Sequence, residues 1–412
     1  MLHIVQVYEF DTLFLDQSYK TIAGDLVRFE KKHFDALLKY NDLHQGKYFA
    51  AVYEGIRFKS YVGVVQVDDL IIEILPKIQR TPETVDWRGV LIEMLRQTEK
   101  LKVNQIGNAF VDKQHIHLLD IYFDWFLTEV EQLQHRGLVK QYYTETKNTL
   151  VLKGKLEFGG HIQKNLVHQE RFYTTHQVYG ADHLIHQILQ LALKVVEKMS
   201  RSTYRYGRCK TAQLHFPEVR DIHVDSNTFE RLLLSRKTEP YRTAIEIARL
   251  IILNYAPNVK AGAEHMLALL FNMNDLWEQY VLVKLQQSIP EWKAEGQTSK
   301  LFWKSKTLRP DIVLTHRISK EVFVIDSKWK NFSYDTISSH DLRQIYVYAD
   351  YWNAVGGMLL YPHYKNVQES TLSDRYHGKD FIAKIGLLSI LDEKGELKDN
   401  IGAEVIKKIA GD

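Results

Sequence analysis

The repeat of hydrophobic residues along this 412-residue chain changes its period twice, and these changes constrain the fold more than any single motif does. Residues 1–85 contain short runs of β-branched and aromatic residues separated by turn-forming residues, a pattern typical of strands. A helix is predicted over residues 25–40, with Asp25 as its N-cap. We therefore expect residues 1–85 to form a β-rich N-terminal module. The predicted strands cover residues 47–52, 61–67 and 70–75.

From Asp86 onward, apolar residues recur three and four positions apart, which is the spacing of one face of a helix. This pattern predicts a mainly helical middle region over residues 86–265. The predicted elements are a helix that ends at Gly137, a strand pair over residues 150–158, a helix with Asp182 as N-cap, and a helix over residues 244–255.

Residues 266–412 have a third rhythm, in which helical and strand-like segments alternate. This order predicts a compact α/β domain and makes the whole chain an α+β multidomain protein. The predicted elements are a helix over residues 267–285, strands over 301–303, 311–315 and 321–328, a helix over 339–352, and a strand over 357–361 that Pro362 ends.

The composition excludes several classes of protein. With 45% hydrophobic and 25% charged residues, the chain resembles an ordinary globular protein and is neither collagen-like nor disordered. Its longest apolar stretches, such as residues 354–361, are much shorter than the ~18 residues of a membrane span. The N-terminus lacks the basic region of a secretory signal, and Cys209 is the only cysteine, so we expect a reducing cytoplasm. No G-x-x-x-x-G-K-S/T motif is present, so the chain is not expected to hydrolyse nucleotides by itself.

One group of residues in the C-terminal region carries recognisable chemistry. Asp311 begins one predicted strand, and Asp326 and Lys328 lie on the next, where alternation places them on the same face and turns Ser327 away. A hairpin would bring Asp311 beside Asp326. Two carboxylates near a lysine can hold a hard cation such as Mg²⁺, which needs only one or two carboxylates besides water and substrate phosphate. The alternative is a half-buried Asp–Lys pair at a sheet edge.

Other residues are placed to support such a site. Glu278 lies on the preceding predicted helix, while Gln344 and Tyr348 are one turn apart on the following helix. Residues 291–330 contain nine Lys or Arg against five Asp or Glu. Within this stretch, the residues predicted to contact DNA phosphates are Lys300, Lys304, Lys306 and Arg309.

Two further groups are open to more than one interpretation. The spacing of His115 with His117, and of His183 with His186, would allow metal binding, but no cysteine or acidic cluster accompanies them, so surface or helix-face histidines are favoured. Residues 201–210 interleave basic residues with tyrosines, and could contact DNA or a partner, or form a solvated loop.

The sequence Pro310-Asp311 followed by Asp326-Ser327-Lys328 resembles the signature of the PD-(D/E)XK nuclease superfamily, and Gln344 with Tyr348 resembles its QxxxY extension. The wider chain resembles the McrC family, the nuclease subunit of the McrBC modified-cytosine restriction system. Segments that carry this resemblance are residues 61–65, 72–78, 154–156, 179–182 and 271–278.

The resemblance implies a Mg²⁺-dependent DNA endonuclease that acts with a separate AAA+ GTPase of McrB type. It implies an N-terminal region that docks on this motor, and a C-terminal nuclease core with a mixed sheet flanked by helices. Asp311 and Asp326 would be metal ligands, Lys328 the catalytic lysine, and Glu278 a supporting carboxylate. The partner would recognise the modified base, so this chain does not reveal the target. Two alternatives remain open: a scaffold that mainly activates the motor, and a stand-alone repair nuclease.

Overall fold

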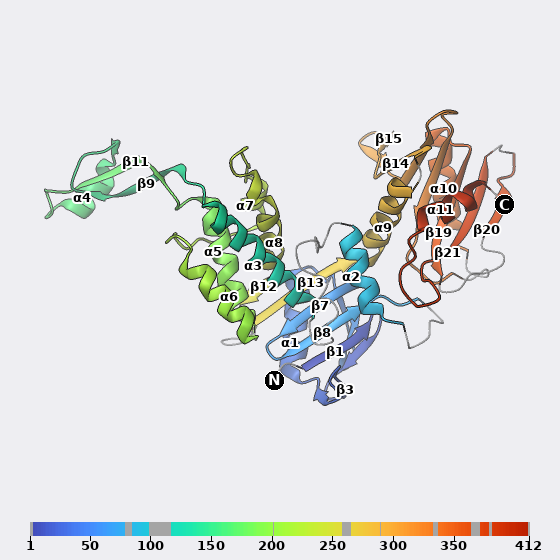
Figure 1. Ribbon diagram of the computed structural model, residues 1–412, viewed down its shortest axis with the longest axis horizontal. Helices are drawn as coiled ribbons and strands as arrows, with labels where there is room; N and C mark the ends of the chain where they lie inside the picture. The colour runs from blue at the N-terminus through green and yellow to red at the C-terminus, as the bar shows by residue number, and fades with distance from the viewer. Residues whose placement is uncertain are drawn as a thin grey trace. The chain divides into compact units, whose positions relative to one another are not determined.

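The structure, a computed structural model, has a mixed α+β architecture with several separate sheets (Figure 1). It describes residues 3–78, 85–98, 117–200, 202–257, 265–288, 290–332, 337–363, 371–378 and 381–410. Two compact units are present. Unit 1 combines Met1–Val103 with Leu270–Asp412, and unit 2 is Asn104–Leu269. The division into three domains at residues 85 and 265 stays a prediction.

The N-terminal part of unit 1 is built around three long strands. Strand β8 (Leu70–Leu75) pairs in parallel with β1 (His3–Tyr8) and antiparallel with β7 (Tyr61–Val67). All six residues of β8 are buried, as expected for a strand that is covered on both faces. The strands predicted over 61–67 and 70–75 are confirmed. Smaller elements complete this part: β2 (Thr12–Phe14), β3 (Ser18–Lys20), β4 (Leu26–Arg28), α1 (Lys31–Leu43), β5 (Phe49–Val52), β6 (Gly55–Phe58) and α2 (Trp87–Gln97).

The helix predicted over residues 25–40 begins later than expected, and Asp25 is not its N-cap. Residues of β4 pair with β3 in a short hairpin, so this segment is strand and not the first turn of a helix. Helix α1 begins at Lys31, where Glu30 and His33 form a reciprocal capping box. The predicted start was wrong because Asp25 lies in the connection between β3 and β4 and not at a helix terminus.

The C-terminal part of unit 1 contains a six-stranded mixed sheet in the order β14-β17-β18-β19-β21-β20. Helix α10 packs on one face, where Ile345 meets Val324 beside Gly357. Helix α11 covers the other face, where Lys408 approaches Gly386. The elements are α9 (Met273–Ser288), β14 (Trp292–Gly296), β15 (Lys300–Trp303), β16 (Lys306–Leu308), β17 (Ile312–His316), β18 (Val322–Ser327), α10 (Ser339–Trp352), β19 (Gly356–His363), β20 (Thr371–Arg375), β21 (Ile382–Ser389) and α11 (Ile401–Ala410).

Two predictions for this region are wrong in part. The first residues of the helix predicted over 267–285 form strand β13 (His265–Asn272), and α9 begins only at Met273. A short continuous apolar run does not distinguish a buried strand from a buried helix. Pro362 does not end β19, because it pairs in register with Leu388 of β21. Proline has no backbone N–H to donate to a neighbouring strand. This costs nothing at Pro362, because β18 pairs with β19 only as far as Leu360.

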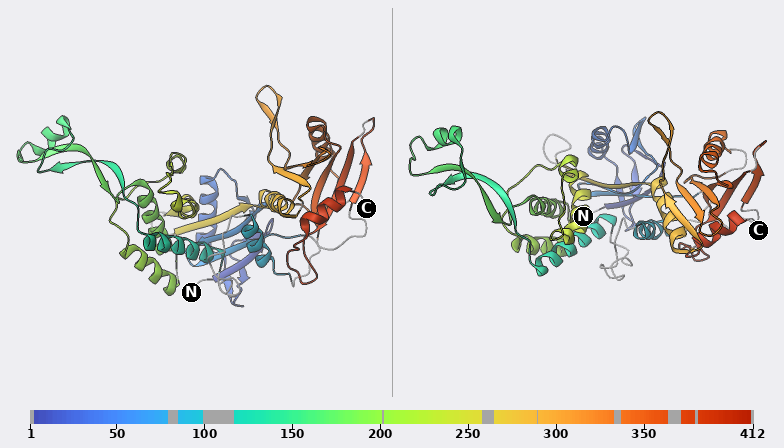
Figure 2. Two further views of the ribbon diagram at one scale, coloured as in Figure 1. Left: turned by 45° about the horizontal axis from the view of Figure 1, so that its top comes forward. Right: turned by 90° about the horizontal axis from the view of Figure 1, so that it is seen from above.

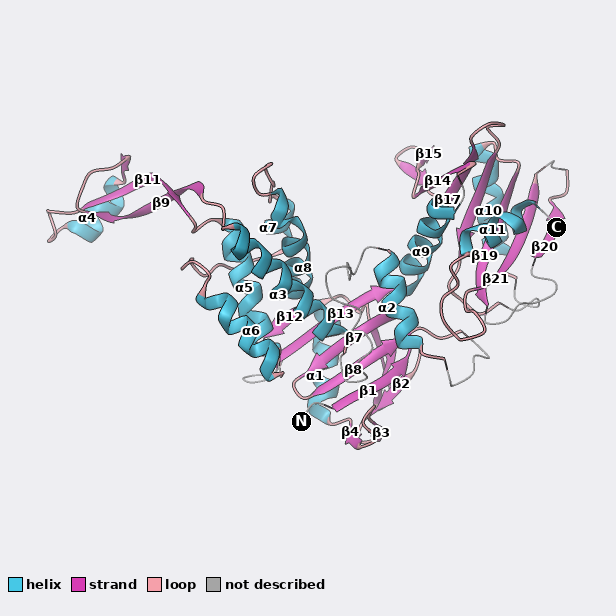
Figure 3. Cartoon of the chain, viewed as in Figure 1, coloured by secondary structure: helices cyan, strands magenta, loops and turns pink. Residues whose placement is uncertain are grey.

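Unit 2 consists of packed helices and a long two-stranded ribbon (Figure 3). The ribbon pairs β9 (Gln141–Thr149) with β11 (Phe172–Gly180) along their whole length, and β10 (Lys155–Leu156) adds to the edge of β11. The other elements are α3 (Leu118–Arg136), α4 (Phe158–Asn165), α5 (Leu184–Met199), α6 (Thr203–Leu214), α7 (Ser226–Glu230), η3 (Glu239–Tyr241), α8 (Arg242–Leu253) and β12 (Tyr255–Pro257).

The ribbon corrects the strand pair predicted over residues 150–158. The pairing partners are β9 and β11, while Gly154 lies in the connection with a positive φ of 67°. A Cβ atom at Gly154 would lie 2.4 Å from the carbonyl oxygen of Thr175, so only glycine fits there. Asp182 is not the N-cap of α5. His183 occupies that position, and the carboxylate of Asp182 instead accepts a hydrogen bond from Gln187.

Candidate active site

The two predicted aspartates lie side by side where β17 and β18 meet. The register pairs Ile312 with Ile325, which places Asp311 opposite Asp326 at the next position. Asp326 is buried, with 1% of its surface exposed. Ser327 contributes more than expected, because its backbone N–H and its hydroxyl both donate to Oδ2 of Asp311, at 2.7 and 3.1 Å. The prediction that Ser327 turns away is therefore wrong. Strict alternation fails here because Ser327 is the last residue of its strand.

Lys328 follows β18 directly and joins the carboxylates to helix α10. Its Nζ lies 2.6 Å from Oδ2 of Asp326 and donates to Oε1 of Gln344 at 3.3 Å. The amide of Gln344 in turn donates to the hydroxyl of Tyr348 at 3.0 Å. The one-turn spacing of these two residues thus produces a linear chain of contacts, Tyr348 to Gln344 to Lys328 to Asp326. The structure brings all four of these predicted residues together.

Glu278 lies on α9, near Asp311. Its Oε1 accepts a hydrogen bond from the side-chain amide of Gln297, the residue that follows β14. The backbone N–H of Gln297 donates to the carbonyl oxygen of Asp311 at 3.0 Å. Gln297, which the sequence did not single out, therefore links Glu278 to Asp311.

The electrostatics of the site are dominated by crowded acidic groups. Burial and the neighbouring Asp311 raise the pKa of Asp326 to about 6. Burial and the same Asp311 raise the pKa of Glu278 to about 7. Burial also raises the pKa of Asp311, although Ser327 counteracts this with its hydrogen bonds. For Lys328, burial favours the neutral form, yet Asp326 and Asp311 raise its pKa above the usual value. Lys328 thus offsets part of the negative charge of Asp311 and Asp326, and a bound cation would relieve the repulsion that remains.

The oxygen donors of Asp311 and Asp326 suit a hard divalent cation that keeps several water ligands. Within the described ranges, no three His, Cys, Asp or Glu side chains are grouped to hold a metal, so the described side chains alone do not supply a full set of ligands. A Mg²⁺ ion here would be held by Asp311 and Asp326 and would take its other ligands from water and substrate phosphate.

The histidines whose spacing would allow metal binding are His115 with His117 and His183 with His186, and among the described residues none belongs to a group that could hold a metal. His183 and His186 are buried, and His183 contacts the carbonyl oxygen of Val139 through Nε2. His186 contacts the carbonyl oxygen of Ala181 and the hydroxyl of Tyr241, so both ring nitrogens have protein partners. His117 caps α3 by accepting from the backbone of Asp120, and His115 lies outside the described residues.

Two further residues near the site were missed. Asp341 lies in the first turn of α10, 2.5 Å from Nζ of Lys330, and its charge adds to the repulsion that raises the pKa of Asp326. Its position one helical turn before Gln344 is a signal that could have identified it. Trp329 follows Lys328 and is buried, with its ring 5.6 Å from that of Trp277, the residue before Glu278.

The predicted DNA-contacting residues lie on or next to the β15–β16 hairpin, and all of them are exposed. Arg309 precedes Asp311 by two residues, and its positive charge opposes part of the rise in the pKa of Asp311 and of Glu278. Lys300 donates to the carbonyl oxygen of Tyr351 at 3.0 Å. The basic residues of the hairpin thus lie just before Asp311 and strand β17 in the chain.

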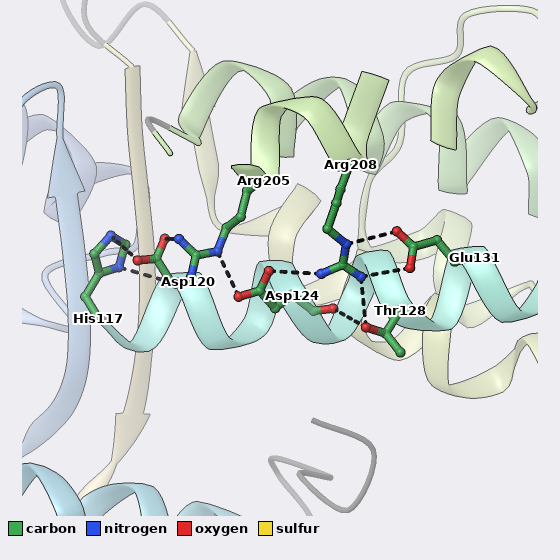
Figure 4. Close-up of polar contacts among 7 residues, drawn as sticks. All are labelled: His117, Asp120, Asp124, Thr128, Glu131, Arg205 and Arg208. Carbon is green, nitrogen blue, oxygen red and sulfur yellow. Dashed lines mark hydrogen bonds and ion pairs between the residues drawn. The ribbon is translucent and has the colours of Figure 1, made fainter. Parts of the chain in front are cut away.

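The basic stretch at residues 201–210 lies mainly in a helix and not in a solvated loop, and two of its arginines are engaged within the protein. Arg201 lies outside the described residues, and the remainder belongs mainly to helix α6. Arg205 and Arg208 point at α3, where both pair with Asp124 (Figure 4). These ion pairs are largely buried and hold the two helices together, so neither side chain is available to a phosphate. Further members of the network are His117, Asp120, Thr128 and Glu131.

Comparisons with known proteins agree on one family. A family model described as McrBC 5-methylcytosine restriction system component matches residues 56–362. The type IV methyl-directed restriction enzyme EcoKMcrBC of Escherichia coli K12 is 22% identical over 303 residues, which are 66% of this chain and 83% of that protein.

Two solved structures share the fold. One is the half-complex from a tetradecameric assembly of Thermococcus gammatolerans McrB AAA+ hexamers with bound McrC. It matches with a TM-score of 0.70 and 19% identity over 99% of both chains. The other is the McrBC complex of the same organism, with a TM-score of 0.50 and 22% identity over 70% of this chain and 89% of that chain.

Among the described helices, none combines the length and apolar character needed to cross a bilayer. Since the family model spans well over half of the sequence, the chain belongs to the McrBC 5-methylcytosine restriction system component family, in agreement with the McrC-like resemblance of its sequence.

Proposed function

We propose that this chain is the nuclease subunit of a modification-dependent restriction system and hydrolyses DNA phosphodiester bonds with Mg²⁺. The observation that carries the proposal is the convergence of Asp311, Asp326 and Lys328 at the ends of two paired strands. The mixed sheet and the helices that cover it support the same proposal, because this architecture is the one expected of a PD-(D/E)XK nuclease core.

In this proposal, Asp311 and Asp326 hold Mg²⁺, which when bound lowers the pKa of a coordinated water and stabilises negative charge on the phosphate. Lys328 is charged, because the aspartates favour its protonated form, and it holds the attacking water or a phosphate oxygen. Gln344 fixes the direction of Nζ, and Tyr348 fixes Gln344. Glu278 supports the site from the side of Asp311.

Lys300, Lys304, Lys306 and Arg309 would hold the DNA backbone beside the site by charge. Contacts of this kind attract and orient DNA without reading its sequence. The neighbouring exposed hairpin and the absence of acidic residues between Gln297 and Asp311 support this assignment.

We further propose that the chain acts with an AAA+ GTPase partner of McrB type. The support is a fold shared with a structure in which McrB AAA+ hexamers bind McrC, and a curated relative described as methyl-directed. The partner would recognise the modified DNA, while this chain would stimulate GTP hydrolysis and cut. The motor-contacting surface is expected in residues 1 to about 265.

One experiment separates the proposal from its alternatives. Cleavage of methylated DNA and GTP hydrolysis are measured with and without the partner, for the wild type and for Asp326→Ala. Asp374→Ala, at an exposed position on β20 of the same sheet, is the matched control. We expect Asp326→Ala to lose cleavage and keep GTPase stimulation.

Other outcomes favour other functions. Stimulation of GTP hydrolysis without any Mg²⁺-dependent cutting by the wild type would identify a scaffold. Cutting by the chain alone, unaffected by partner and GTP, would identify a stand-alone nuclease. Equal loss of both activities in Asp326→Ala would show that cleavage and stimulation are not separable.

A further inference from the structure

The β15–β16 hairpin of unit 1 exposes large apolar side chains at its tip. It stands out from the six-stranded sheet as a narrow orange loop in the left view of Figure 2. Leu301, Phe302 and Trp303 are 70%, 49% and 62% exposed. Trp303 pairs with Lys306 at the last position before the turn. Because these three exposed side chains are consecutive, and contiguous exposed apolar patches mark interaction sites, this tip is a candidate contact surface.

The hairpin is held rigidly in spite of its exposure. The ring of Phe302 packs edge-on against that of Tyr351 on α10, with 5.4 Å between the centroids, and the hydroxyl of Tyr351 donates to the carbonyl oxygen of Phe302. Nζ of Lys300 lies 4.7 Å from the ring centre of Trp352. These contacts fix the base and one side of the hairpin and leave Trp303 free to meet a ligand at a defined place.

The base of the hairpin is also connected to the candidate active site by hydrogen bonds. At its base, the N–H of Gln297 donates to the carbonyl oxygen of Asp311, and the side chain of Gln297 binds Glu278. From Asp311 to the turn at Lys306 is five residues, so the tip reaches at most about 17 Å from the site. Along DNA this corresponds to about five base steps.

The positive charge of the hairpin indicates which class of partner it would bind. Residues 298–309 contain four basic residues and no acidic residue, which suits a polyanion. Nζ of Lys304 lies 4.9 Å from the ring centre of Trp303, so a cationic group accompanies the most prominent aromatic ring. Aromatic side chains flanked by basic ones are typical of surfaces that hold a nucleic-acid backbone and stack on its bases.

We propose that Trp303 is a wedge that enters duplex DNA and stacks on a base within about five base steps of the cut, while the adjacent basic residues hold the phosphates. This inference rests on the proposed nuclease function and adds a second point of contact to it. Apolar wedges unstack a base step and bend the duplex, which fixes the DNA along its axis. Lysines alone would allow the DNA to slide. The wedge therefore determines which phosphate lies at Asp311 and Asp326.

The test uses the full chain and a short duplex in Ca²⁺, which permits binding without cutting. The fluorescent adenine analogue 2-aminopurine, which brightens when it leaves the stack, is placed at successive positions around the cut that the wild-type complex makes in Mg²⁺. We expect brightening at one or two positions within about five steps of the cut. Trp303→Ala should abolish this signal and weaken binding by about 5- to 150-fold, and Trp303→Phe should restore most of both.

Two matched variants identify the physical basis of the contact. Ile318→Ala removes an even more exposed apolar side chain from the β17–β18 turn, at the end of the six-stranded sheet away from Asp311 and Asp326, and should change neither signal nor affinity. Lys306→Ala should lower the slope of log affinity against log salt by about 0.9, whereas Trp303→Ala should leave that slope unchanged.

The outcomes also distinguish this inference from the nuclease assignment. If the wild-type complex cuts in an Asp326-dependent manner but no position brightens, or Trp303→Ala binds within two-fold of the wild type, the wedge is rejected and the nuclease stands. If Trp303→Ala changes the oligomeric state and leaves DNA binding intact, the hairpin contacts protein and the wedge is rejected. Absence of cleavage by the complex would reject the nuclease itself.

Discussion

Glu9 and Trp329 are 320 positions apart in the sequence, yet Nε1 of Trp329 donates to Oε1 of Glu9 at 2.6 Å in a buried contact. The backbone N–H of Lys77 donates to the same oxygen at 3.2 Å. Trp329 is bonded covalently to Lys328, and its ring lies against that of Trp277, which precedes Glu278. The residue that follows β1 therefore supports the backbone of Lys328 through Trp329, and that of Glu278 through Trp329 and Trp277.

The first prediction is that this support affects the rate of cleavage. Glu9→Leu removes the acceptor and should lower kcat roughly ten-fold or more, because small displacements of catalytic groups cost large factors in rate. KM and DNA binding should change little, since Glu9 lies behind the site. Glu9→Gln keeps an acceptor and should retain most activity. A loss of DNA affinity that parallels the loss of kcat in Glu9→Leu would contradict this role.

The second prediction concerns stability and pH. Burial raises the pKa of Glu9 from 4.5 to about 7. The folded state thus binds this proton more tightly than the unfolded chain, so the stabilisation is fully present below pH 4.5 and is lost as the pH rises to about 7. The free energy of unfolding of the wild type should fall over this interval by roughly 3 kcal/mol relative to Glu9→Gln. Denaturant titrations at several pH values measure this difference, and parallel curves for the two proteins would be inconsistent with it.

The third prediction concerns the metal. Without a cation, Asp311 and Asp326 repel each other, so Asp326→Asn should keep or raise the Tm in the presence of a chelator. Mg²⁺ should raise the Tm of the wild type and leave that of Asp326→Asn unchanged. Cleavage should fall at least about 100-fold in Asp326→Asn and in Asp311→Ala. Asp374→Asn serves as the control, and near-normal Mg²⁺-dependent cutting by either site variant would show that the proposed metal site is wrong.

The fourth prediction separates binding from cutting at Lys328. Lys328→Ala should keep DNA affinity in Ca²⁺, which spreads over many phosphate contacts, and lose cleavage in Mg²⁺ by about 10² to 10³. Lys328→Arg should restore little, because a planar guanidinium places its donors differently from an ammonium. Gln344→Leu should lose less, roughly ten-fold, because Gln344 only orients Nζ. Parallel loss of binding and cutting in Lys328→Ala would make Lys328 a DNA-binding or structural residue.

Several strands and one helix of unit 1 could be predicted, because the residues that determine them lie within each element. The bounds of β7, β8 and α10 agree with the prediction, since the strands have dense β-branched residues and Ser338 caps the helix with its hydroxyl. The β17–β18 hairpin follows from two apolar runs with a turn between them, and its register sets Asp311 opposite Asp326.

Other parts carry no local signal. In β9, intermediate and exposed residues follow one another and none is buried, so this strand lacks the apolar face that strand prediction requires. Its stability comes from pairing with β11, which is distant in the sequence. Ser327 was misplaced because alternation does not hold at a strand end. The contact of Glu9 with Trp329 depends on tertiary packing alone, and no pattern within either segment indicates it.

Unit 1 is assembled from both ends of the sequence, with unit 2 between them. During translation, the N-terminal strands therefore leave the ribosome well before Asp311, Asp326 and Lys328 are synthesised. An incomplete product that stops within unit 2 would lack every candidate catalytic residue, and its Glu9 would lack the indole that it binds in the finished fold. Under the proposed nuclease function, an N-terminal fragment released early would therefore have no active site and would cut no DNA.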